Sequence, residues 1–470
     1  MKQNNSSTDS LGHENNTFLK QSHAGILSAV SKKELRCGES VKWDAPSETQ
    51  PDVWSEDLTW SWSLPLNKSK EEFKNEIFME NESASTCTGF CCMGASSLVR
   101  GFVKPSSCRQ HLNYFFEFNP RHVPIYSLVD SIALWKKANP TMVDFNILFI
   151  GDSVQGQVFH AALCELRRSP QVSKIEYSVG ENTVSFDDRK AYLIPVESKI
   201  HFHDAELEST RTTVSYFSMY RSARDEEVLF LMFRKFHIIF LGWGLHYTSL
   251  PPNIFEQDMN KVFNALARVY RTSMIVKPTI IWMGHPKQHF SYEDFGHNSY
   301  GWFIETFNTE KCSATSRVCS GHHGQDLRND LGMTVARNLG FTTSRLVLGL
   351  PSHCIRNFTS PRLHLFPFVE TTGPFHMNHR SAFAGLGKRR DCTHICWAPN
   401  YYVSIWQATF LAVNASACLP EFTPRYKSGP QKGFSRYAGI IYHPVNLTEN
   451  NSRIVGPILR DLKLYLANSR

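Results

Sequence analysis

Three short apolar runs, each followed by a glycine, constrain the fold of this chain more than any other feature. They are Phe145–Ile150 before Gly151, His237–Leu241 before Gly242, and Thr279–Met283 before Gly284. Continuous apolar runs of this length are typical of strands that are buried on both faces of a parallel sheet. The sequence therefore predicts a sheet whose strands end in tight turns.

Helical periodicity alternates with these runs. Apolar faces are marked by Val154, Val158, Ala161 and Ala162, by Phe255, Met259, Val262, Leu266 and Val269, and by Leu327, Leu331, Val335 and Leu339. Gly340 is placed to end the last of these helices. Strands that alternate with helices predict an α/β sandwich with a mostly parallel sheet. Its ligand site is expected at the carboxyl ends of the strands, where the glycine turns fall.

Polarity divides the 470 residues into four segments. Residues 1–85 are polar and rich in Asn, Ser and Glu, which predicts a flexible stem. Residues 86–143 form a cysteine-containing lead-in, residues 144–420 the α/β domain, and residues 421–470 a C-terminal extension with no assigned role. A hydrophobic content of 41% over this length is sufficient for one large core with appendages.

The charge of the chain argues against a nucleic-acid partner. The net charge of +7 is mild for this length, and the Lys and Arg residues are scattered. The one dense cluster, Lys388–Arg390, is too short to follow a phosphate backbone. No nucleic acid is therefore expected among the partners.

Cysteines and glycosylation sequons indicate the cellular route. Twelve cysteines and recurrent Asn-x-Ser/Thr sequons favour the secretory pathway, where disulfides form and glycans are attached. A cytosolic protein with free buried thiols is the alternative. No segment approaches the ~20 apolar residues of a membrane span, and the N-terminus lacks the apolar core of a signal peptide. A secretory location thus implies an anchor upstream of this sequence, and membrane contact is expected only through it.

Gly151-Asp152-Ser153 closes the first apolar run and opens a helix. A serine on such a turn projects from the top of the sheet, and the helix N-terminus supplies N–H groups and a positive dipole for an oxyanion. Asp and Ser are also common helix N-caps. The motif therefore predicts either a nucleophile at Ser153 or a cap.

A second motif, Asp391-Cys392-Thr393-His394-Ile395-Cys396, lies far later in the chain. A serine hydroxyl needs a base that takes its proton, and that base needs an acceptor that orients it. His394 and Asp391 can fill these two roles. Two alternatives remain: a zinc site formed by Cys-x-His-x-Cys, and a surface histidine beside a disulfide. A secreted chain favours cystines over metal thiolates.

Together the two motifs resemble the SGNH-fold PC-esterase family, which includes the trichome-birefringence-like polysaccharide O-acetyltransferases. Four further features agree in their order along the chain: Cys108, Leu163-Cys164, Pro286–Phe290 and Trp406. The resemblance spans about residues 87–412, and the Asp-Cys-x-His-x-Cys block is its most specific part.

The resemblance implies an SGNH-hydrolase-like α/β/α sandwich with a mostly parallel sheet and a cysteine-rich N-terminal lead-in. It also implies a Golgi-lumen setting and O-acetyl transfer to a glycan or polysaccharide through an acyl-serine intermediate. Ser153 would be the nucleophile, His394 the base and Asp391 its orienting partner. The resemblance implies an acetyl donor as co-substrate, with no bound cofactor and no metal.

Two other functions share these residues. A carbohydrate acetyl esterase would use the same Ser-His-Asp triad, with water in place of the sugar hydroxyl. A non-catalytic glycan-binding protein with a decayed site is the alternative of another class. Five aromatic residues near the motifs fit either sugar stacking or the core: Trp243, Tyr247, Trp397, Tyr401 and Tyr402.

Departures from the family concern the oxyanion hole. Plant members carry Arg and Asn three and four residues after the serine, where this chain has Gly156 and Gln157. They also carry Asn-x-Gly-His after the second strand, where this chain reads Gly242–His246. Candidate oxyanion or substrate-binding residues are therefore Gly244, Gln157, His246 and His289. His289 fits equally well as a hydrogen-bonded loop histidine.

Overall fold

The computed structural model describes residues 40–42, 52–54, 59–63, 117–178, 182–186, 189–194, 196–219, 223, 225–247, 252–272, 277–287, 289, 296–297, 303–304, 315–317, 327–351, 361–373, 375, 379–380, 391–395, 399–417 and 439–442. The stem and lead-in predictions for the other residues up to 116, including Cys108, and most of the C-terminal extension lie outside this part of the chain.

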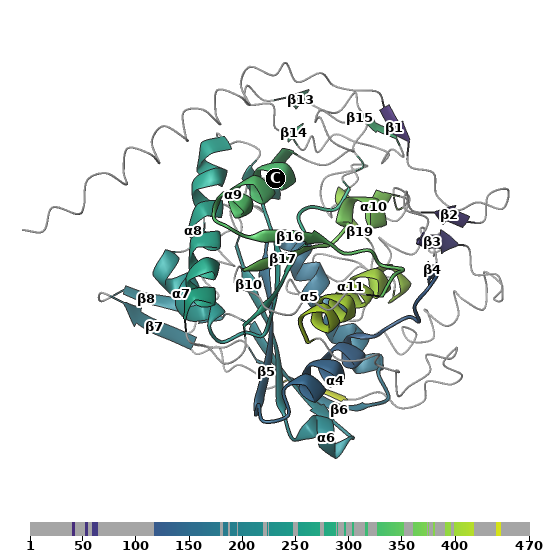
Figure 1. The fold of residues 1–470 in the computed structure, drawn as a ribbon, viewed down its shortest axis with the longest axis vertical. Helices are drawn as coiled ribbons and strands as arrows, with labels where there is room; N and C mark the ends of the chain where they lie inside the picture. The colour runs from purple at the N-terminus through teal and green to yellow at the C-terminus, as the bar shows by residue number, and fades with distance from the viewer. Residues whose placement is uncertain are drawn as a thin grey trace, which may run out of the picture.

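A mostly parallel sheet of nine strands forms the centre of the molecule (Figure 1). In spatial order the strands are β16 (Thr342–Arg345), β17 (Arg362–Leu365), β12 (Thr279–Trp282), β11 (Ile238–Gly242), β5 (Asp144–Gly151), β10 (Arg211–Ser218), β9 (Val196–Phe202), β6 (Val172–Ser178) and β20 (Gly439–Tyr442). Among these described strands, β9 alone runs antiparallel to its neighbours. The six strands from β16 to β10 are all parallel.

Helices cover both faces of the sheet, which makes a three-layer α/β/α arrangement (Figure 1). One face carries α4 (Leu128–Ala138), α5 (Ser153–Arg168) and α11 (Pro399–Ala417), and the other carries α7 (Glu226–Phe233), α8 (Pro252–Arg271) and α9 (Leu327–Asn338). In β5, Phe149 belongs to the first core and Leu148 to the second. Because alternate side chains of a strand face opposite layers, a strand buried on both faces is apolar throughout.

The predicted elements of the α/β domain are confirmed. The three apolar runs form β5, β11 and β12, and the three periodic segments form α5, α8 and α9. The apolar face of α8 is fully buried from Phe255 to Val269. Gly340 lies two residues beyond α9 with a φ of 85°, a left-handed conformation that ends helices.

Part of the expected flexible stem is folded. β3 (Trp60–Ser63) pairs with β2 (Asp52–Trp54) on one side and with β4 (Glu117–Pro120) on the other. Trp62 is fully buried and its ring packs edge-on against Phe375 at 4.9 Å. For these residues the stem prediction differs from the structure, since burial of two indoles offsets the loss of chain entropy.

The boundaries at residues 143 and 421 also fall inside the folded unit. α4 lies in the expected lead-in, yet it packs against α11 in the first core, and the rings of Tyr126 and Phe410 stack at 3.6 Å. β20 lies in the expected extension and pairs with β6 as an edge strand of the sheet. Segment polarity alone did not indicate these long-range contacts.

Shorter elements complete the described part of the chain. They are β1 (Ser40–Lys42), β7 (Asn182–Phe186), β8 (Arg189–Ile194), α6 (Ala205–Glu208), η2 (Leu245–Tyr247), β13 (Gly296–His297), β14 (Phe303–Ile304), β15 (Thr315–Arg317), α10 (Phe368–Thr372), β18 (His379–Arg380) and β19 (Asp391–Ile395). No helix within the described ranges has both the length and the apolar character to cross a bilayer.

Candidate active site

The carboxyl ends of β5 and β11 lie side by side, with Gly151 paired to Gly242. The helix that follows β5 covers one face of the sheet, and the helix that follows β11 covers the other. Ligand sites of open α/β sheets lie where connections diverge in this way. A Cβ on Gly151 would stand 1.8 Å from the Gly242 carbonyl oxygen. The glycine therefore allows the two strand ends to approach each other closely.

Ser153 and His394 meet at this end of the sheet. The distance between His394 Nε2 and Ser153 Oγ is 2.7 Å, which is a hydrogen bond. Ser153 is the first residue of α5, and His394 comes from β19, far away in the sequence. Both residues are half-buried, so the pair is held in place and remains accessible. This is the distance that a general base needs from the hydroxyl it deprotonates.

Asp152 caps α5, and Ser153 begins it. Asp152 Oδ1 accepts a hydrogen bond from the Val154 N–H at 3.1 Å. Asp152 is thus the cap, and the nucleophile interpretation of Ser153 stays a prediction. Among the described residues the Ser153 N–H has no acceptor, as is usual for the first N–H of a helix. It can therefore donate to an oxyanion that forms beside its own Oγ.

Asp391 begins β19, and its backbone pairs with Arg380 of β18. The position of its carboxylate lies outside the described part of the structure. Its role as the orienting residue of His394 therefore stays a sequence prediction.

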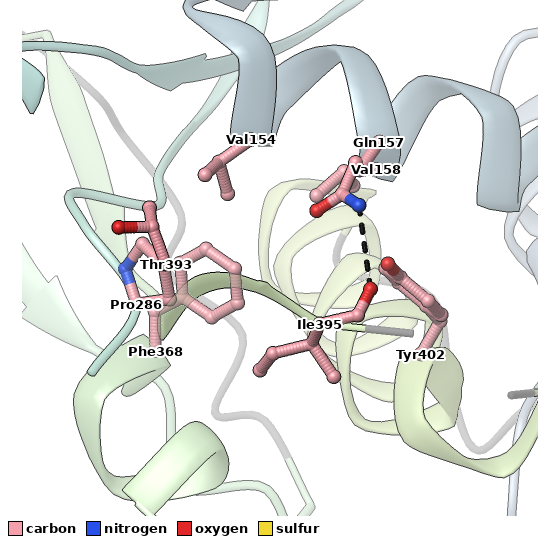
Figure 2. Close-up of a pocket in the computed structure, with 8 residues that line it drawn as sticks. All are labelled: Val154, Gln157, Val158, Pro286, Phe368, Thr393, Ile395 and Tyr402. Atoms are coloured by element: carbon pink, nitrogen blue, oxygen red, sulfur yellow. Dashed lines mark hydrogen bonds between the residues drawn. The ribbon is translucent and has the colours of Figure 1, made fainter. Parts of the chain in front are cut away.

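Hydrogen bonds on both sides of His394 hold β19 in place. The Gln157 side chain donates from Nε2 to the Ile395 carbonyl at 3.3 Å (Figure 2). The His289 N–H donates to the Cys392 carbonyl at 3.0 Å, and His289 Nε2 lies 2.8 Å from the Gly373 carbonyl. In this structure Gln157 and the fully buried His289 thus support the strand that carries the base. Of the two interpretations of His289, the geometry is that of the hydrogen-bonded loop histidine.

The turn after β11 is hydrogen-bonded to the turn Gly151–Ser153, which follows β5. The N–H groups of Gly244 and Leu245 both donate to Asp152 Oδ2 at 3.2 Å. The Gly244 N–H, an expected oxyanion donor, is thus already bonded to a carboxylate. Gly244 has a φ of 131°, and a Cβ there would stand 2.9 Å from His285 Nε2, so this position requires glycine. His246 follows on η2 and is half-buried.

Two buried charged residues, Asp152 and Arg328, hold this turn through hydrogen bonds. The sequence did not single out either residue for holding the turn. Asp152 is 1% exposed, and burial raises its pKa to about 6 although hydrogen bonds and the charges of His394 and Arg328 lower it. Arg328 of α9 is 0% exposed and donates from Nη1 to the carbonyls of Gly244 and Leu245, at 3.0 and 3.2 Å. Asp152 belongs to the motif and was recognisable there as a cap. No motif or spacing in the sequence indicated that Arg328 would lie at this site.

Gly156 lies beside the Tyr216 hydroxyl, which leaves little room for a larger side chain at this position. A Cβ on Gly156 would stand 3.2 Å from the Tyr216 hydroxyl oxygen, a close contact. That hydroxyl donates to the Asp152 carbonyl at 3.0 Å. Tyr216 therefore occupies the space beside residue 156 and holds the backbone of the turn Gly151–Ser153.

A small pocket of about 220 Å³, partly open to solvent, lies between α5, α10, α11 and β19 (Figure 2). Its lining is mostly apolar and consists of Val154, Gln157, Val158, Pro286, Phe368, Thr393, Ile395 and Tyr402. Val154 follows Ser153, and Thr393 and Ile395 flank His394, so the pocket borders the dyad without containing it.

The aromatic and cysteine residues near the site also have defined places. Trp243 and Tyr247 are 0% exposed and belong to the second core, so they are core residues in this structure. Tyr402 is buried and borders the pocket. Cys164 and Cys392 are both disulfide-bonded, so Cys392 is not a free thiolate for zinc. Within the described residues, no group of three or more His, Cys, Asp or Glu side chains could hold a metal ion.

Comparison with known proteins adds no family to this description. No protein-family model matches the chain, and no curated protein has a significantly similar sequence. The geometry of the dyad and its surroundings therefore carries the functional argument.

Proposed function

We propose that this protein is a serine-dependent acyl enzyme of the SGNH type, an O-acetyltransferase that acts on a glycan through an acyl-Ser153 intermediate. The observation that carries the proposal is the 2.7 Å distance between Ser153 Oγ and His394 Nε2. The position of this pair at the carboxyl end of β5 supports it. The acetyl group, the glycan and a Golgi setting come from the motif resemblance.

In the first half-reaction Ser153 Oγ attacks the acetyl carbonyl of the donor, and His394 Nε2 takes the hydroxyl proton. The carbonyl oxygen becomes an oxyanion, which the Ser153 N–H and the N-terminal dipole of α5 stabilise. When the tetrahedral species collapses, the bond to the leaving group breaks. The proton on His394 passes to that group, and acetyl-Ser153 remains.

In the second half-reaction a sugar hydroxyl attacks the acetyl-serine carbonyl while His394 takes its proton. The bond from the carbonyl carbon to Ser153 Oγ breaks, and Oγ regains the proton from His394. The product is the acetylated sugar, and the enzyme is restored. Asp391 would hold the imidazole with its Nδ1–H turned away from the serine.

Hydrolysis is the second candidate, and one observation favours it. Ser153 and His394 are half-buried, so water can reach the acyl-serine in this conformation. A transferase must exclude water or bind the acceptor ahead of it. The esterase would use the same residues, with water as the acceptor.

The first experiment tests the nucleophile. The full chain is incubated with a fluorophosphonate probe, and intact-mass spectrometry measures phosphonylation. Ser153→Ala should abolish the adduct, whereas Ser169→Ala, at the opposite end of the same helix, should leave it unchanged. Equal labelling of the two variants would overturn the assignment of Ser153.

The second experiment separates transfer from hydrolysis. The protein receives an activated acetyl ester together with bare oligosaccharides, and mass spectrometry follows the acetyl group. Acetylated oligosaccharide that depends on Ser153 is the expected result. Release of free acetate without any acetylated sugar would replace the transferase with the esterase. Labelling without turnover of any acetyl ester would overturn both acetyl assignments.

A further inference from the structure

The turn Gly244–Leu245, which follows β11, is bracketed by two buried charges. Its two N–H groups point to the Asp152 carboxylate, and its two carbonyl groups point to the Arg328 guanidinium. Asp152 is 1% exposed and Arg328 is 0% exposed. All four backbone polar groups of these two residues are therefore bound by charged side chains that water does not reach.

The direction of these bonds gives the bracket its stability. Hydrogen bonds to ionised groups are stronger than those between neutral groups. The peptide dipoles of the turn run from the cation toward the anion, so each charge favours the orientation that the other imposes. The opposite charge of Arg328 also favours the ionised form of Asp152. If one partner is removed, the other stays buried and loses part of its compensation.

This bracket connects directly to the nucleophile. Asp152 precedes Ser153 and also caps α5 through the Val154 N–H. The Tyr216 hydroxyl fixes the Asp152 carbonyl. One continuous set of hydrogen bonds thus joins the Arg328 guanidinium of α9 to the turn after β11 and to the first turn of α5. A shift of Arg328 would move the turn, then Asp152, and then Ser153.

We infer that Asp152 and Arg328 are positioning residues, which clamp the turn Gly244–Leu245 and so hold Ser153 Oγ and its N–H in register with His394. Neither residue touches the reacting atoms in this role. The Gly244 N–H is then a structural donor, and the oxyanion receives its backbone hydrogen bond from Ser153. The inference rests on the proposed role of Ser153 as nucleophile and extends it to α9, on the other face of the sheet.

The central experiment removes the guanidinium and measures the reactivity of Ser153. Arg328→Met should slow fluorophosphonate labelling by roughly 10- to 100-fold, since misplacement by about 1 Å costs that much. With an ester substrate kcat should fall and KM should change little. Arg337→Met, an exposed arginine on the same helix, is the matched control and should label at the wild-type rate. Urea unfolding of each variant measures stability separately from reactivity.

Two further variants make the result decisive. Arg328→Lys keeps the charge and should recover part of the labelling rate that Arg328→Met loses. Asp152→Asn combined with Arg328→Met should lose less than the product of the two single losses, because each single variant already breaks the bracket that the two charges form together.

Each outcome bears on a separate claim. A folded Arg328→Met protein that labels within twofold of the wild type would overturn the positioning role and leave Ser153 as the nucleophile; where Arg328→Met does not fold, the same result with the folded double variant would overturn it. Multiplicative losses in the double variant would overturn the coupling through the turn. If the wild-type protein takes no label, the serine assignment fails and this inference fails with it.

Discussion

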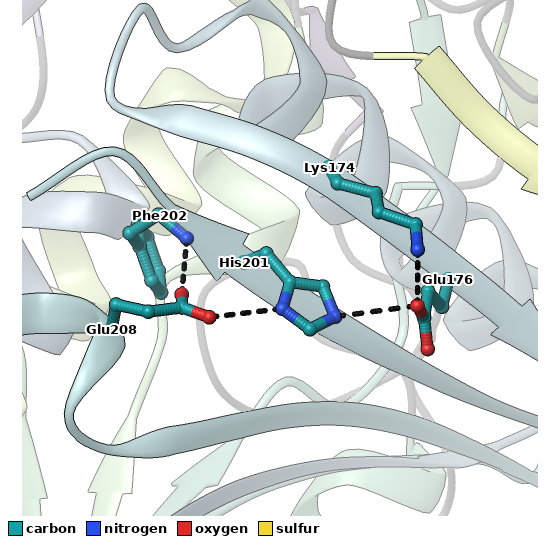
Figure 3. A network of polar contacts seen from close by, with 5 residues as sticks. All are labelled: Lys174, Glu176, His201, Phe202 and Glu208. Atoms are coloured by element: carbon teal, nitrogen blue, oxygen red, sulfur yellow. Dashed lines mark hydrogen bonds and ion pairs between the residues drawn. The ribbon is translucent and has the colours of Figure 1, made fainter.

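Two clusters of charged residues in this protein are built from the same kinds of contacts, yet the pKa values of their carboxyl groups are shifted in opposite directions. In one, the Asp152 carboxylate accepts backbone N–H groups and lies in the field of Arg328 and His394. In the other, Glu208 Oε2 accepts the Phe202 N–H at 2.6 Å, and its second oxygen lies 3.0 Å from His201 Nδ1 (Figure 3). The pKa of Asp152 is raised, whereas the pKa of Glu208 is lowered.

Depth in the fold accounts for this difference. Burial is the largest influence on both carboxyl groups, and it raises the pKa of each. At Asp152, which is almost completely buried, burial outweighs every hydrogen bond. At Glu208, whose side chain is 44% exposed, the hydrogen bonds from Phe202 and His201 and the charges of His201 and Lys136 together outweigh it. Hydrogen-bond partners alone therefore do not tell which form a carboxyl group favours.

The other side chains of the cluster around His201 are also partly exposed to solvent. His201 Nε2 lies 3.6 Å from Glu176 Oε1, and Lys174 pairs with the same carboxylate (Figure 3). The Lys174 hydrogen bond holds the pKa of Glu176 below its ordinary value. The cluster joins β6, β9 and α6, and solvent screens its charges. We expect perturbed chemistry only in the buried cluster around Asp152.

The largest effect on activity is expected at Ser153, which follows Asp152 of the buried cluster. Ser153→Ala removes the nucleophile, and acyl turnover should fall by at least about 10⁴-fold. Urea unfolding should stay close to the wild type, because the hydroxyl is half-buried and bonds only to His394 among the described residues. Steady-state kinetics with an acetyl ester measures the loss. Turnover that survives the substitution would place the chemistry elsewhere.

A pair of glycines sharpens the contrast between buried and exposed positions. Gly151→Ala drives a methyl group against the Gly242 carbonyl oxygen. It should lower the unfolding free energy by at least about 1–3 kcal/mol, and it should also lower the activity. Gly340→Ala meets no atom within 4 Å, and only its positive φ opposes the substitution. It should cost about 1 kcal/mol and leave activity unchanged. Denaturant midpoints of the two variants give the comparison, and equal losses would contradict it.

The pH dependence of stability tests the burial of Asp152. Its pKa is about 6 in the folded protein against an ordinary 3.8, so its contribution is greatest below pH ~4 and is lost as the pH rises through 6. Relative to Asp152→Asn, the unfolding free energy of the wild type should fall by about 3 kcal/mol over that window. Urea unfolding from pH 3.5 to 7.5 measures it. A difference between the two proteins that does not vary with pH would refute the raised pKa.

The smallest effect is expected in the exposed cluster, and its sign is opposite. The pKa of Glu208 is lowered, so its contribution is present above pH ~4.5 and is lost as the pH falls below that value. Glu208→Gln should change the unfolding free energy by less than about 1 kcal/mol, and by less still in 1 M salt. Labelling of Ser153 should not change. A loss as large as that at Asp152 would remove the distinction between the two clusters.

The peripheral segments show where sequence patterns lose their predictive value. The three strands that end in glycine and the three periodic helices were predictable because local hydrophobic spacing specifies them. The pairing of β3 with β4 and the docking of Trp62 on Phe375 were not predictable, since they depend on contacts between distant segments. The same holds for β20, which completes the sheet from the far end of the chain.

The sequence by itself determined the alternation of strands and helices, the serine on a strand-to-helix turn, and the histidine as its candidate base. Only the tertiary structure decided that His394 reaches Ser153 at 2.7 Å, that Gln157 and His289 support β19, and that Asp152 and Arg328 enclose the turn between them. The physical reason is that local spacing fixes which residues share a face. Burial and opposing charge arise only when separate elements pack together.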